Sequence, residues 1–425
     1  MSATEMAPKP SRRYKRGNQA AILLTCAGLL VITGACTAIV MWAGTIARNA
    51  NAQAWGTNIN ILLGMMFIAI VLSIAGVARL GAEGGSADPV SSGTRRLWLI
   101  LAALILIHSY LALLLNKKAS GDTIDTFTFQ RDATKSLVHG IDPYGGTQAN
   151  IFDPNHTAIF YGPGMVVNGR VQVGFQYPPL TLLWALPGYL LGDVRYSYIF
   201  AVIVSALLSF AICPNRRGLW IASVLLISPL TLLIENRCWT EPLVLLALSA
   251  TVYAALKKRW WLPVALGLFL ATKQYNFLAL PFMGCFIRPF QWRAYWKLTG
   301  LSLAIGVATV LPFAFWNFRG LWHDLVLFHL AQPFRQDAVS FAVPFPFMLK
   351  IGPVLVMAFI VWATQARRRN SAMFAAAYGV ALLLFVTTSK QAFANYYFLI
   401  AQTFFLSVAA LAALRESPVG SQDWA

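Results

Sequence analysis

The segment AAILLTCAGLLVITGACTAIVMW at 20–42 decides the fold class of this chain, because it is almost wholly apolar and long enough to cross a bilayer as a helix. A hydrocarbon layer of roughly 30 Å requires about 20 helical residues. Similar segments recur along most of the 425 residues, of which 58% are apolar and 11% charged. Soluble domains are about a quarter charged. The sequence therefore predicts an all-α, polytopic transmembrane helical bundle.

We expect about twelve spans plus interfacial helices in the outer loops. The segment 178–192 is also apolar, but it is short, begins at Pro178-Pro179 and contains Pro187-Gly188. We interpret it as a re-entrant or short helix, because a crossing there would move every later basic loop to the opposite side of the membrane. The expected spans are 20–42, 59–78, 97–115, 196–212, 218–234, 242–256, 260–272, 275–287, 298–316, 351–366, 371–388 and 394–413.

Basic residues gather in short clusters between the apolar segments, beginning with SRRYKR at 11–16. Cytoplasmic loops are enriched in Lys and Arg, so this pattern predicts a cytoplasmic N-terminus in a multi-pass protein of the cell (plasma) membrane. The net charge of +18 is explained by these loops and by their attraction to anionic lipids, and it does not predict a nucleic-acid partner. The other basic loops expected on this side are 79–96, 214–217, 257–259, 288–297 and 367–369.

Neither a Gly-Ser linker nor a clear repeat divides the chain. We expect residues 1–96 to form the cytoplasmic N-terminus and two accessory transmembrane helices, and 97–425 to form one membrane domain with a large extracytoplasmic loop at 116–195. The sequence lacks a P-loop, a Rossmann fingerprint and any strong metal-ligand spacing of Cys, His, Asp or Glu. It therefore predicts no metal and no cofactor.

The outer loop is the part of the chain in which carboxylates concentrate, with Asp122, Asp125 and Asp132 close together. Residues 124–139 are free of proline and are followed by Gly140, which favours a helix with a left-handed glycine at its end. Asp122 is a candidate N-cap of this helix, and Asp125 falls in its first turn. Such an acid either complements the helix N-terminus or serves as a base in a cavity.

Two aromatic turn motifs follow, GIDPYG at 140–145 and FQYPP at 175–179. Asp-Pro disfavours helix and starts a turn. Tyr144 and Tyr177 are therefore either interfacial anchors or ligand contacts, and the sequence leaves both interpretations open.

The second polar region outside the spans is WHDLVLFHLAQPFRQDAVS at 322–340, which predicts an interfacial helix broken near Pro333. Its His329 and Arg335 are suited to hold a phosphate, or to contact ordinary lipid headgroups.

Lysines at the outer ends of two spans are costly unless they reach water or serve a site. These are Lys273, followed by Gln274, and Lys390. Glu235 and Glu241 flank another outer turn, where either an internal pair with Arg237 or a substrate contact is expected.

The order of these motifs resembles the GT-C superfamily of membrane glycosyltransferases, and most closely the polyprenol-phosphate-mannose-dependent α-(1,2)-mannosyltransferases. The resemblance covers roughly 97–413. It implies a lipid-linked sugar donor and an acid in the first large outer loop as catalytic base, a role that falls on Asp125 with Asp122 as the alternative. It also implies donor-phosphate contacts from His329 and Arg335. The motifs that carry it are Asp125 with GIDPYG, YPPL at 177–180, ATKQY at 271–275, FHLAQPFRQD at 328–337 and KQAFANYYF at 390–398.

We therefore expect an inverting hexosyltransferase that moves a sugar such as mannose from a polyprenyl-phosphate donor to a cell-envelope glycan or glycolipid acceptor on the extracytoplasmic side. One carboxylate suffices for a single displacement, and cations can neutralise the phosphate without a metal. Lys273 and Lys390 are added to the expected phosphate ligands. The expected substrate contacts are Tyr144, Tyr177, Gln274 and Asp337.

Other activities remain compatible with the sequence. A transporter or flippase of polyprenyl-linked glycans would also contain intramembrane charges and broken helices. A glycan ligase or polymerase would act on the same lipid phosphates. The residues do not distinguish mannose from arabinose, glucose or an amino sugar.

Overall fold

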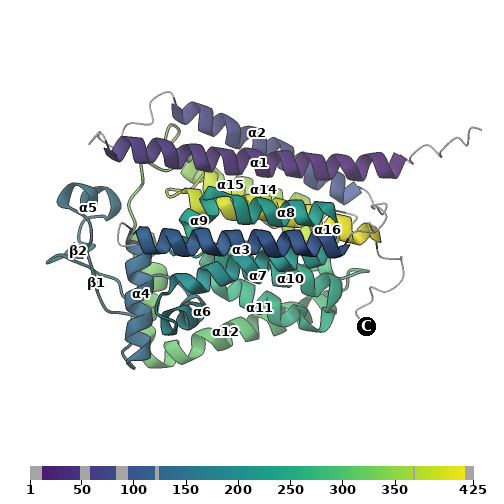
Figure 1. Ribbon diagram of the computed structural model, residues 1–425. Helices are drawn as coiled ribbons and strands as arrows, with labels where there is room; N and C mark the ends of the chain where they lie inside the picture. Colours follow the sequence, from purple (N-terminus) through teal and green to yellow (C-terminus); the bar gives the residue numbers. More distant parts are fainter. Residues whose placement is uncertain (1–11, 48–57, 83–93, 120–123, 367–368, 417–425) are drawn as a thin grey trace, which may run out of the picture.

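The computed structural model describes residues 12–47, 58–82, 94–119, 124–366 and 369–416. In these residues nearly every element is helical, and the long helices run side by side in one bundle (Figure 1). Helices satisfy all backbone hydrogen bonds internally, which the hydrocarbon layer requires of a spanning segment. The predicted polytopic helical bundle is confirmed.

Six described helical segments are long and apolar enough to cross a membrane. A seventh span results if α8 (Arg216–Ile227) and α9 (Pro229–Asn236), which are bent by 52°, cross as one. Shorter apolar helices are Arg259–Thr272, α14 (Met348–Thr364) and α15 (Ser371–Thr387). The six are Gln19–Ile39 in α1 (Arg12–Ala47), Asn60–Leu80 in α2 (Asn58–Ala82), α3 (Thr94–Lys118), α7 (Arg195–Ile212), Trp292–Ala331, and Ala394–Leu414 in α16 (Ala394–Glu416).

Several of the expected spans form helices that are too short to cross a membrane by length and composition. Residues 242–256 lie in α10 (Glu241–Lys257), and 260–272 lie in η1 (Arg259–Trp261) and α11 (Leu262–Thr272). The expected helix at 275–287 is a 3-10 helix, η2 (Gln274–Phe286). Because a 3-10 helix rises about 2.0 Å per residue, against 1.5 Å in an α-helix, its 13 residues extend over about 26 Å.

The segment expected to be re-entrant or short forms α6 (Pro179–Leu190). Its 12 residues measure about 18 Å, too short for a ~30 Å layer. The Gly188 N–H donates to Ser197 Oγ at 2.8 Å, which ties α6 to the start of α7. Figure 1 places α6 beside α4 (Asp125–Val138), at one end of the bundle.

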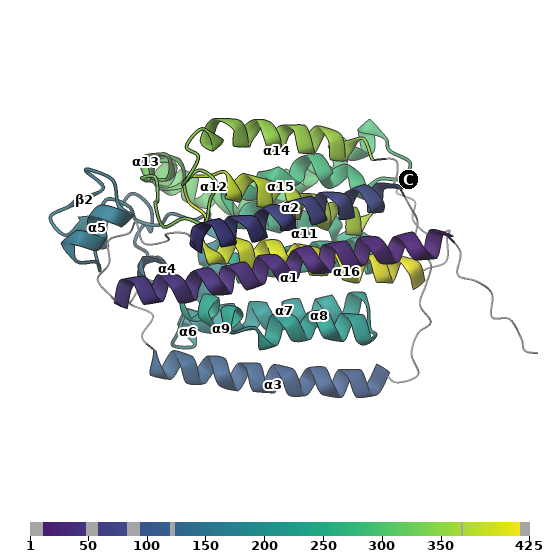
Figure 2. The same ribbon diagram turned by 90° about the horizontal axis from the view of Figure 1, so that it is seen from above.

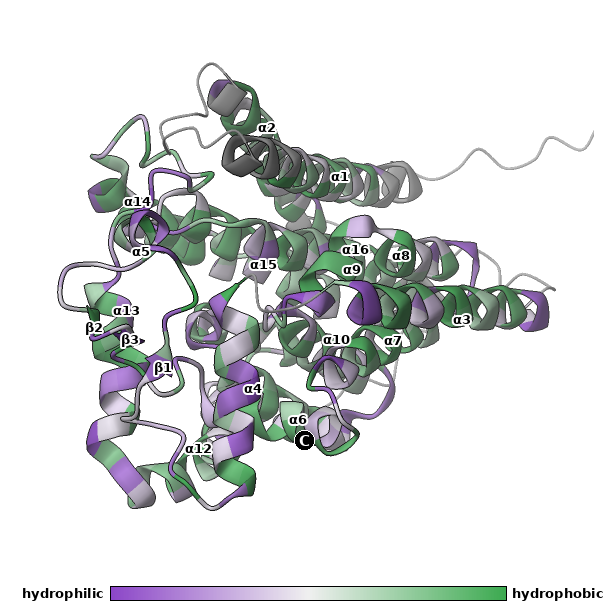
Figure 3. Ribbon diagram, turned by 60° about the vertical axis from the view of Figure 1, so that its left-hand side comes forward, coloured by the Kyte–Doolittle hydropathy of each residue, from purple (hydrophilic) through white to green (hydrophobic). Residues whose placement is uncertain are grey.

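That end, called here the α4 end, also carries a small three-stranded sheet and the short helix α5 (Pro154–Phe160). Its strands are β1 (Gln148–Ala149), β2 (Val166–Val167) and β3 (Arg170–Val171), antiparallel in the order β1-β3-β2. Figure 3 shows hydrophilic residues along α4, whereas α3 and α7 are mostly hydrophobic. Turns distant in sequence meet here, since Thr126 Oγ1 donates to Arg237 O at 2.9 Å and Thr181 Oγ1 to Thr272 O at 2.7 Å.

The first two helices pack on the last two, α1 against α16 and α2 against α15, while α3 lies at the edge of the bundle beside α8 and α9 (Figure 2). The division of the chain after residue 96 stays a prediction.

The GIDPYG motif joins α4 to the C-terminal part of α12 (Trp292–Trp322). Gly140 has φ +70 and ends α4 in the left-handed conformation that the sequence predicts. Asp142 Oδ1 accepts the Tyr144 N–H at 3.0 Å, and its Oδ2 accepts from Asn317 Nδ2 at 2.6 Å, where α12 is kinked. The motif is thus a turn that docks on a helix.

Gly145 allows the turn to approach the backbone of α12 closely. It has φ +70, and a Cβ there would lie 2.8 Å from the Cα of Gly320. We expect Gly145→Ala to lower the free energy of unfolding by about 2 kcal/mol, because both the backbone conformation and the helix contact are lost. Denaturant unfolding in mixed micelles measures this. Gly164→Ala is the matched control, since Gly164 has φ +78 with open space around it. An equal loss in both variants would contradict the close contact.

The interfacial helix expected at 322–340 is a continuation of α12. A π-turn, η3 (His323–Leu327), leads into α13 (Phe328–Ala331), which ends two residues before Pro333. Asp324, in the π-turn, is fully buried, and its Oδ2 accepts three backbone N–H groups, from Gly145 at 3.0 Å and from Gly174 and Phe175 at 2.9 Å. One carboxylate therefore holds both aromatic turn motifs on the helix.

Candidate active site

Asp125 is the first residue of α4 and is half-buried. Its Oδ2 accepts a hydrogen bond from the Tyr161 hydroxyl at 2.7 Å. Burial raises the pKa of Asp125, while the Tyr161 hydrogen bond, the positive charge of Arg335 and backbone N–H groups oppose that rise. The N-cap is Ile124, so the expectation that Asp122 caps the helix is wrong. Asp122 itself lies outside the described residues.

Asp132, the third acid of the outer loop, stands apart from this site. It pairs with the neighbouring Arg131 at 2.8 Å, and both side chains are more than a third exposed. This is a solvated surface pair, which contributes little to stability.

Arg335 is neutralised locally by Asp337. Its Nε and Nη2 donate to the two carboxylate oxygens at 2.7 and 2.6 Å, a bidentate ion pair. The guanidinium also lies over the rings of Phe160, 4.3 Å from the centroid, and Phe393, at 4.8 Å. Asp337, which the sequence analysis expects to contact the substrate, is therefore the counter-ion of Arg335.

Lys273 forms a buried ion pair with Glu241. The Nζ–Oε1 distance is 3.4 Å, and the side chains of Lys273 and Glu241 are 6% and 0% exposed. The ammonium also donates to the Thr240 hydroxyl and lies 4.2 Å from the ring centroid of Tyr177. The interpretation that the Lys273 side chain reaches water is therefore wrong, because its charge is balanced inside the protein.

We expect Lys273→Met to destabilise the protein by about 3–5 kcal/mol, because it leaves the Glu241 carboxylate buried without its cation. Adding Glu241→Gln should recover most of this loss. The measurement is the free energy of unfolding, with Lys118→Met, an exposed lysine on α3, as control. A Lys273→Met variant as stable as wild type would show that the pair carries little energy.

His329 and Gln274 bind the same backbone carbonyl. Gln176 O accepts from His329 Nε2 at 2.8 Å and from Gln274 Nε2 at 3.0 Å. A carbonyl only accepts, so Nε2 of His329 carries the proton. Both side chains fix the backbone next to Tyr177. Donation from His329 Nε2 to a phosphate requires release of this bond, whereas Gln274 Nε2 has a second N–H.

Lys390 differs from the other two cations. Its ammonium donates to Leu330 O at 2.9 Å and to Gln332 O, at the C-terminus of α13. Within the described part of the chain it makes no ion pair with a carboxylate. Burial lowers the pKa of Lys390, although the side chain is only half-buried.

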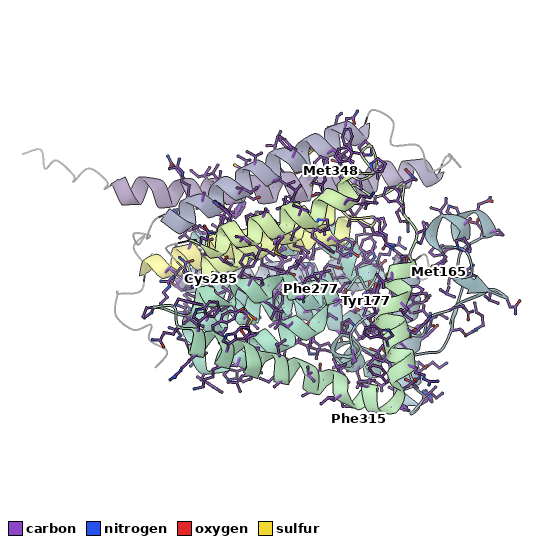
Figure 4. The ribbon with its side chains drawn as sticks, turned by 180° about the vertical axis from the view of Figure 1, so that it is seen from behind. Met165, Tyr177, Phe277, Cys285, Phe315 and Met348 are labelled. Atoms are coloured by element: carbon purple, nitrogen blue, oxygen red, sulfur yellow. The ribbon has the colours of Figure 1, made fainter. Side chains whose placement is uncertain are left out.

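The two tyrosines of the turn motifs are both buried. Tyr144 is 2% exposed, and its hydroxyl donates to Tyr177 O at 2.8 Å. Its ring packs edge-on against Phe175 and Phe313. Direct ligand contact by Tyr144 is thus disfavoured. Tyr177 lies inside the bundle (Figure 4), and its hydroxyl accepts from Gln176 Nε2 at 3.2 Å.

Contacts between neighbouring segments join these groups into one cluster at the α4 end. The Arg335 guanidinium lies over Phe160, next to Tyr161, and the Arg335 N–H donates to Lys390 O at 3.1 Å. Lys273 lies over the ring of Tyr177, and the neighbouring Gln176 O accepts from His329. The structure thus brings the expected base and the expected cations together. This set, named here the α4-end cluster, comprises Asp125, Tyr161, Tyr177, Lys273, His329, Arg335 and Lys390.

Several contacts of these residues join positions distant in the sequence and do not follow from its local pattern. Nothing in the sequence pattern around Tyr161 assigns it to Asp125, which lies 36 positions earlier. For Glu235 and Glu241 the sequence leaves open a pair with Arg237 or a substrate contact, but Glu235 Oε1 lies 2.9 Å from Nε2 of His108, and both side chains are buried. A lone histidine in an apolar span requires a polar partner, and that signal could have identified this pair.

Comparisons with known proteins give matches among solved structures. No family model and no curated protein matches the sequence. The chain is similar to ArnT from Cupriavidus metallidurans bound to undecaprenyl phosphate, with a TM-score of 0.47 and 14% identity, and to its apo state, with 0.46 and 16%. Each alignment covers 77% of this chain and 61% of ArnT, so the chain spans about three-fifths of that protein's length.

Proposed function

We propose that this chain is an integral membrane glycosyltransferase that transfers a sugar from a polyprenyl-phosphate donor to a glycan or glycolipid acceptor. One observation carries the proposal: a half-buried carboxylate, Asp125, held by Tyr161, lies at the same end of a membrane bundle as the cations Arg335, Lys273 and Lys390, which contact the segments on either side of it. The end of a bundle lies near lipid headgroups, where the phosphate of a lipid-linked donor is found.

In this proposal Asp125 takes the proton of the acceptor hydroxyl while that oxygen attacks the anomeric carbon. The bond between the anomeric carbon and the phosphate oxygen breaks, and polyprenyl phosphate leaves with the electron pair. The anomeric centre is inverted, because attack and departure occur on opposite faces. A pKa raised by burial makes Asp125 a stronger base at neutral pH, provided that it is ionised.

The cations stabilise the charge that develops on the departing phosphate. Lys390 is the primary anchor, because its ammonium has a third N–H beyond the two carbonyl contacts and no carboxylate partner in the described residues. Arg335 and Lys273 contribute next, and His329 after release of Gln176 O. We assign the substrate contacts to Tyr177 and Gln274, with Tyr144 acting only through Tyr177 and Asp337 only through Arg335.

A hexose such as mannose, an acceptor in the cell envelope and an extracytoplasmic site complete the proposal. The sugar rests on the sequence resemblance. The side of the membrane rests on the basic clusters near the N-terminus and in the loops, which the positive-inside rule places in the cytoplasm.

Transfer in detergent distinguishes this activity from its alternatives. Purified protein is incubated with radiolabelled polyprenyl-phosphate hexose and a lipid-extract acceptor. A glycosyltransferase consumes the donor and labels the acceptor without a sealed membrane. A transporter leaves the donor intact and requires closed vesicles, so intact donor in detergent with movement across vesicles would favour the transporter.

Tyr161→Phe tests the assignment of Asp125 through its pH dependence. The Tyr161 hydrogen bond lowers the pKa of Asp125, so its removal raises that pKa further. The carboxylate is then protonated, and inactive as a base, up to a higher pH. The acidic limb of the kcat/KM profile should move to higher pH, with Tyr196→Phe as control. A limb that stays in place or moves to lower pH would contradict the assignment.

A further inference from the structure

Glu241, the first residue of α10, has an unusual set of neighbours for a fully buried carboxylate. Its Oε1 accepts from the Tyr275 hydroxyl at 3.2 Å and pairs with Lys273, whereas its Oε2 has no hydrogen-bond partner in the described residues. Charged and titratable groups face it from six other elements or turns. These are Lys273 after α11, Tyr275 in η2, Tyr177 before α6, Tyr198 in α7, Tyr378 in α15 and Tyr396 in α16.

The charge balance of this group does not admit a further anion at Lys273. One ammonium and one carboxylate are neutral together, and the five tyrosines contribute hydroxyl groups only. A phosphodiester brought to Lys273 would place two negative charges beside one buried cation, which burial makes costly. Uptake of one proton by the carboxylate restores neutrality.

Of the two carboxylates that balance a cation in the α4-end cluster, Glu241 is the one more easily displaced. Asp337 holds Arg335 by two short hydrogen bonds, at 2.7 and 2.6 Å. Glu241 holds Lys273 by a single contact at 3.4 Å, longer than the roughly 2.7–2.9 Å of a charge-assisted hydrogen bond. Its second oxygen has unused accepting capacity.

We propose that the donor phosphate displaces Glu241 from Lys273, and that Glu241 takes up one proton as it does so. The Lys273 ammonium moves its contact from the carboxylate oxygen to a phosphate oxygen, and the proton comes from water at the α4 end. The step reverses when the phosphate leaves. This inference rests on the proposed function, because it takes the ligand to be a lipid phosphodiester.

The pH dependence of ligand binding, measured without turnover, tests this inference. The protein carries Asp125→Asn, which slows the reaction and removes the titration of that carboxylate. The probe is the methyl phosphodiester of a polyprenol, which keeps one negative charge across neutral pH. We expect its affinity to increase by up to about tenfold per unit fall in pH, the limit for one linked proton. In Asp125→Asn/Glu241→Gln the part of the pH dependence that belongs to Glu241 should be lost, so the affinity should change less per unit of pH than in Asp125→Asn.

A second measurement needs no substitution at Glu241. Calorimetry of the same binding in buffers of different ionisation enthalpy counts the protons taken up, and we expect a net uptake approaching one. Two results would overturn the inference and leave the proposed function standing. One is an affinity that is independent of pH in the Asp125→Asn protein, and the other is the same pH dependence with and without Glu241→Gln. No binding of the probe at any pH would instead contradict the proposed donor class, and this inference with it.

Discussion

Replacing Asp125 by asparagine should lower the rate of sugar transfer by about 10²–10⁴-fold, the usual contribution of a general base. Asparagine has the same shape and can still accept the Tyr161 hydrogen bond, so the local structure is expected to persist. It cannot remove a proton from an acceptor hydroxyl. Transfer from a labelled polyprenyl-phosphate hexose, measured beside donor binding, gives the result, with rate lost and donor affinity retained.

Two further variants make this experiment decisive. Asp132→Asn is the matched control, because Asp132 lies on the same helix in an exposed pair with Arg131 and should leave transfer unchanged. Asp122→Asn tests the alternative base. Near-normal turnover by Asp125→Asn would remove Asp125 from the mechanism, and an inactive Asp122→Asn beside it would transfer the role to Asp122.

The largest effect on stability is expected from Asp324→Ala. Oδ2 of this carboxylate accepts from the backbone of Gly145, Gly174 and Phe175. Hydrogen bonds to a charged group contribute roughly 1.5–3 kcal/mol each, and buried donors left unpaired are costly. We expect a loss of about 5 kcal/mol in the free energy of unfolding, together with loss of transfer, because the two motifs that carry Tyr144 and Tyr177 lose the carboxylate that joins them.

His323→Ala separates this role from a general effect of the π-turn. The His323 side chain is 45% exposed, and it lies 2.9 Å from Oδ1 of Asp324, not from the Oδ2 that holds the turns. Its loss should therefore change the free energy of unfolding by less than about 1 kcal/mol. Proteolysis of the outer loop gives a second measurement, with faster cleavage expected in Asp324→Ala alone. Equal stability of Asp324→Ala and wild type would show that the turns are held by other contacts.

The features that the sequence predicts well are set by local chemistry. Hydrophobic length predicts the bundle, Gly140 predicts the end of α4, and the prolines of 178–192 predict a short helix. Each depends on residues within one turn or one span. The exception is η2, whose apolar composition does not distinguish 3-10 from α-helix, since the choice depends on how its neighbours pack.

Ion-pair partners were predicted poorly, because they depend on which helices become neighbours. Lys273 pairs with Glu241, 32 positions earlier, because α11 packs against α10. His108 reaches Glu235 only because α3 packs beside α9. Arg335 and Asp337 are two positions apart, yet the sequence equally allowed both to face a substrate. Composition identified the charged residues of the site, and tertiary contacts determined which of their charges are already balanced.

A structure of the protein with a non-transferable polyprenyl-phosphate sugar analogue tests the central claim most directly. We expect the phosphate to lie within hydrogen-bond distance of Lys390 and of at least one of Arg335 and Lys273, with the anomeric carbon facing Asp125. A headgroup bound at the opposite end of the bundle, or at the α4 end with Asp125 turned away from the sugar, would contradict it.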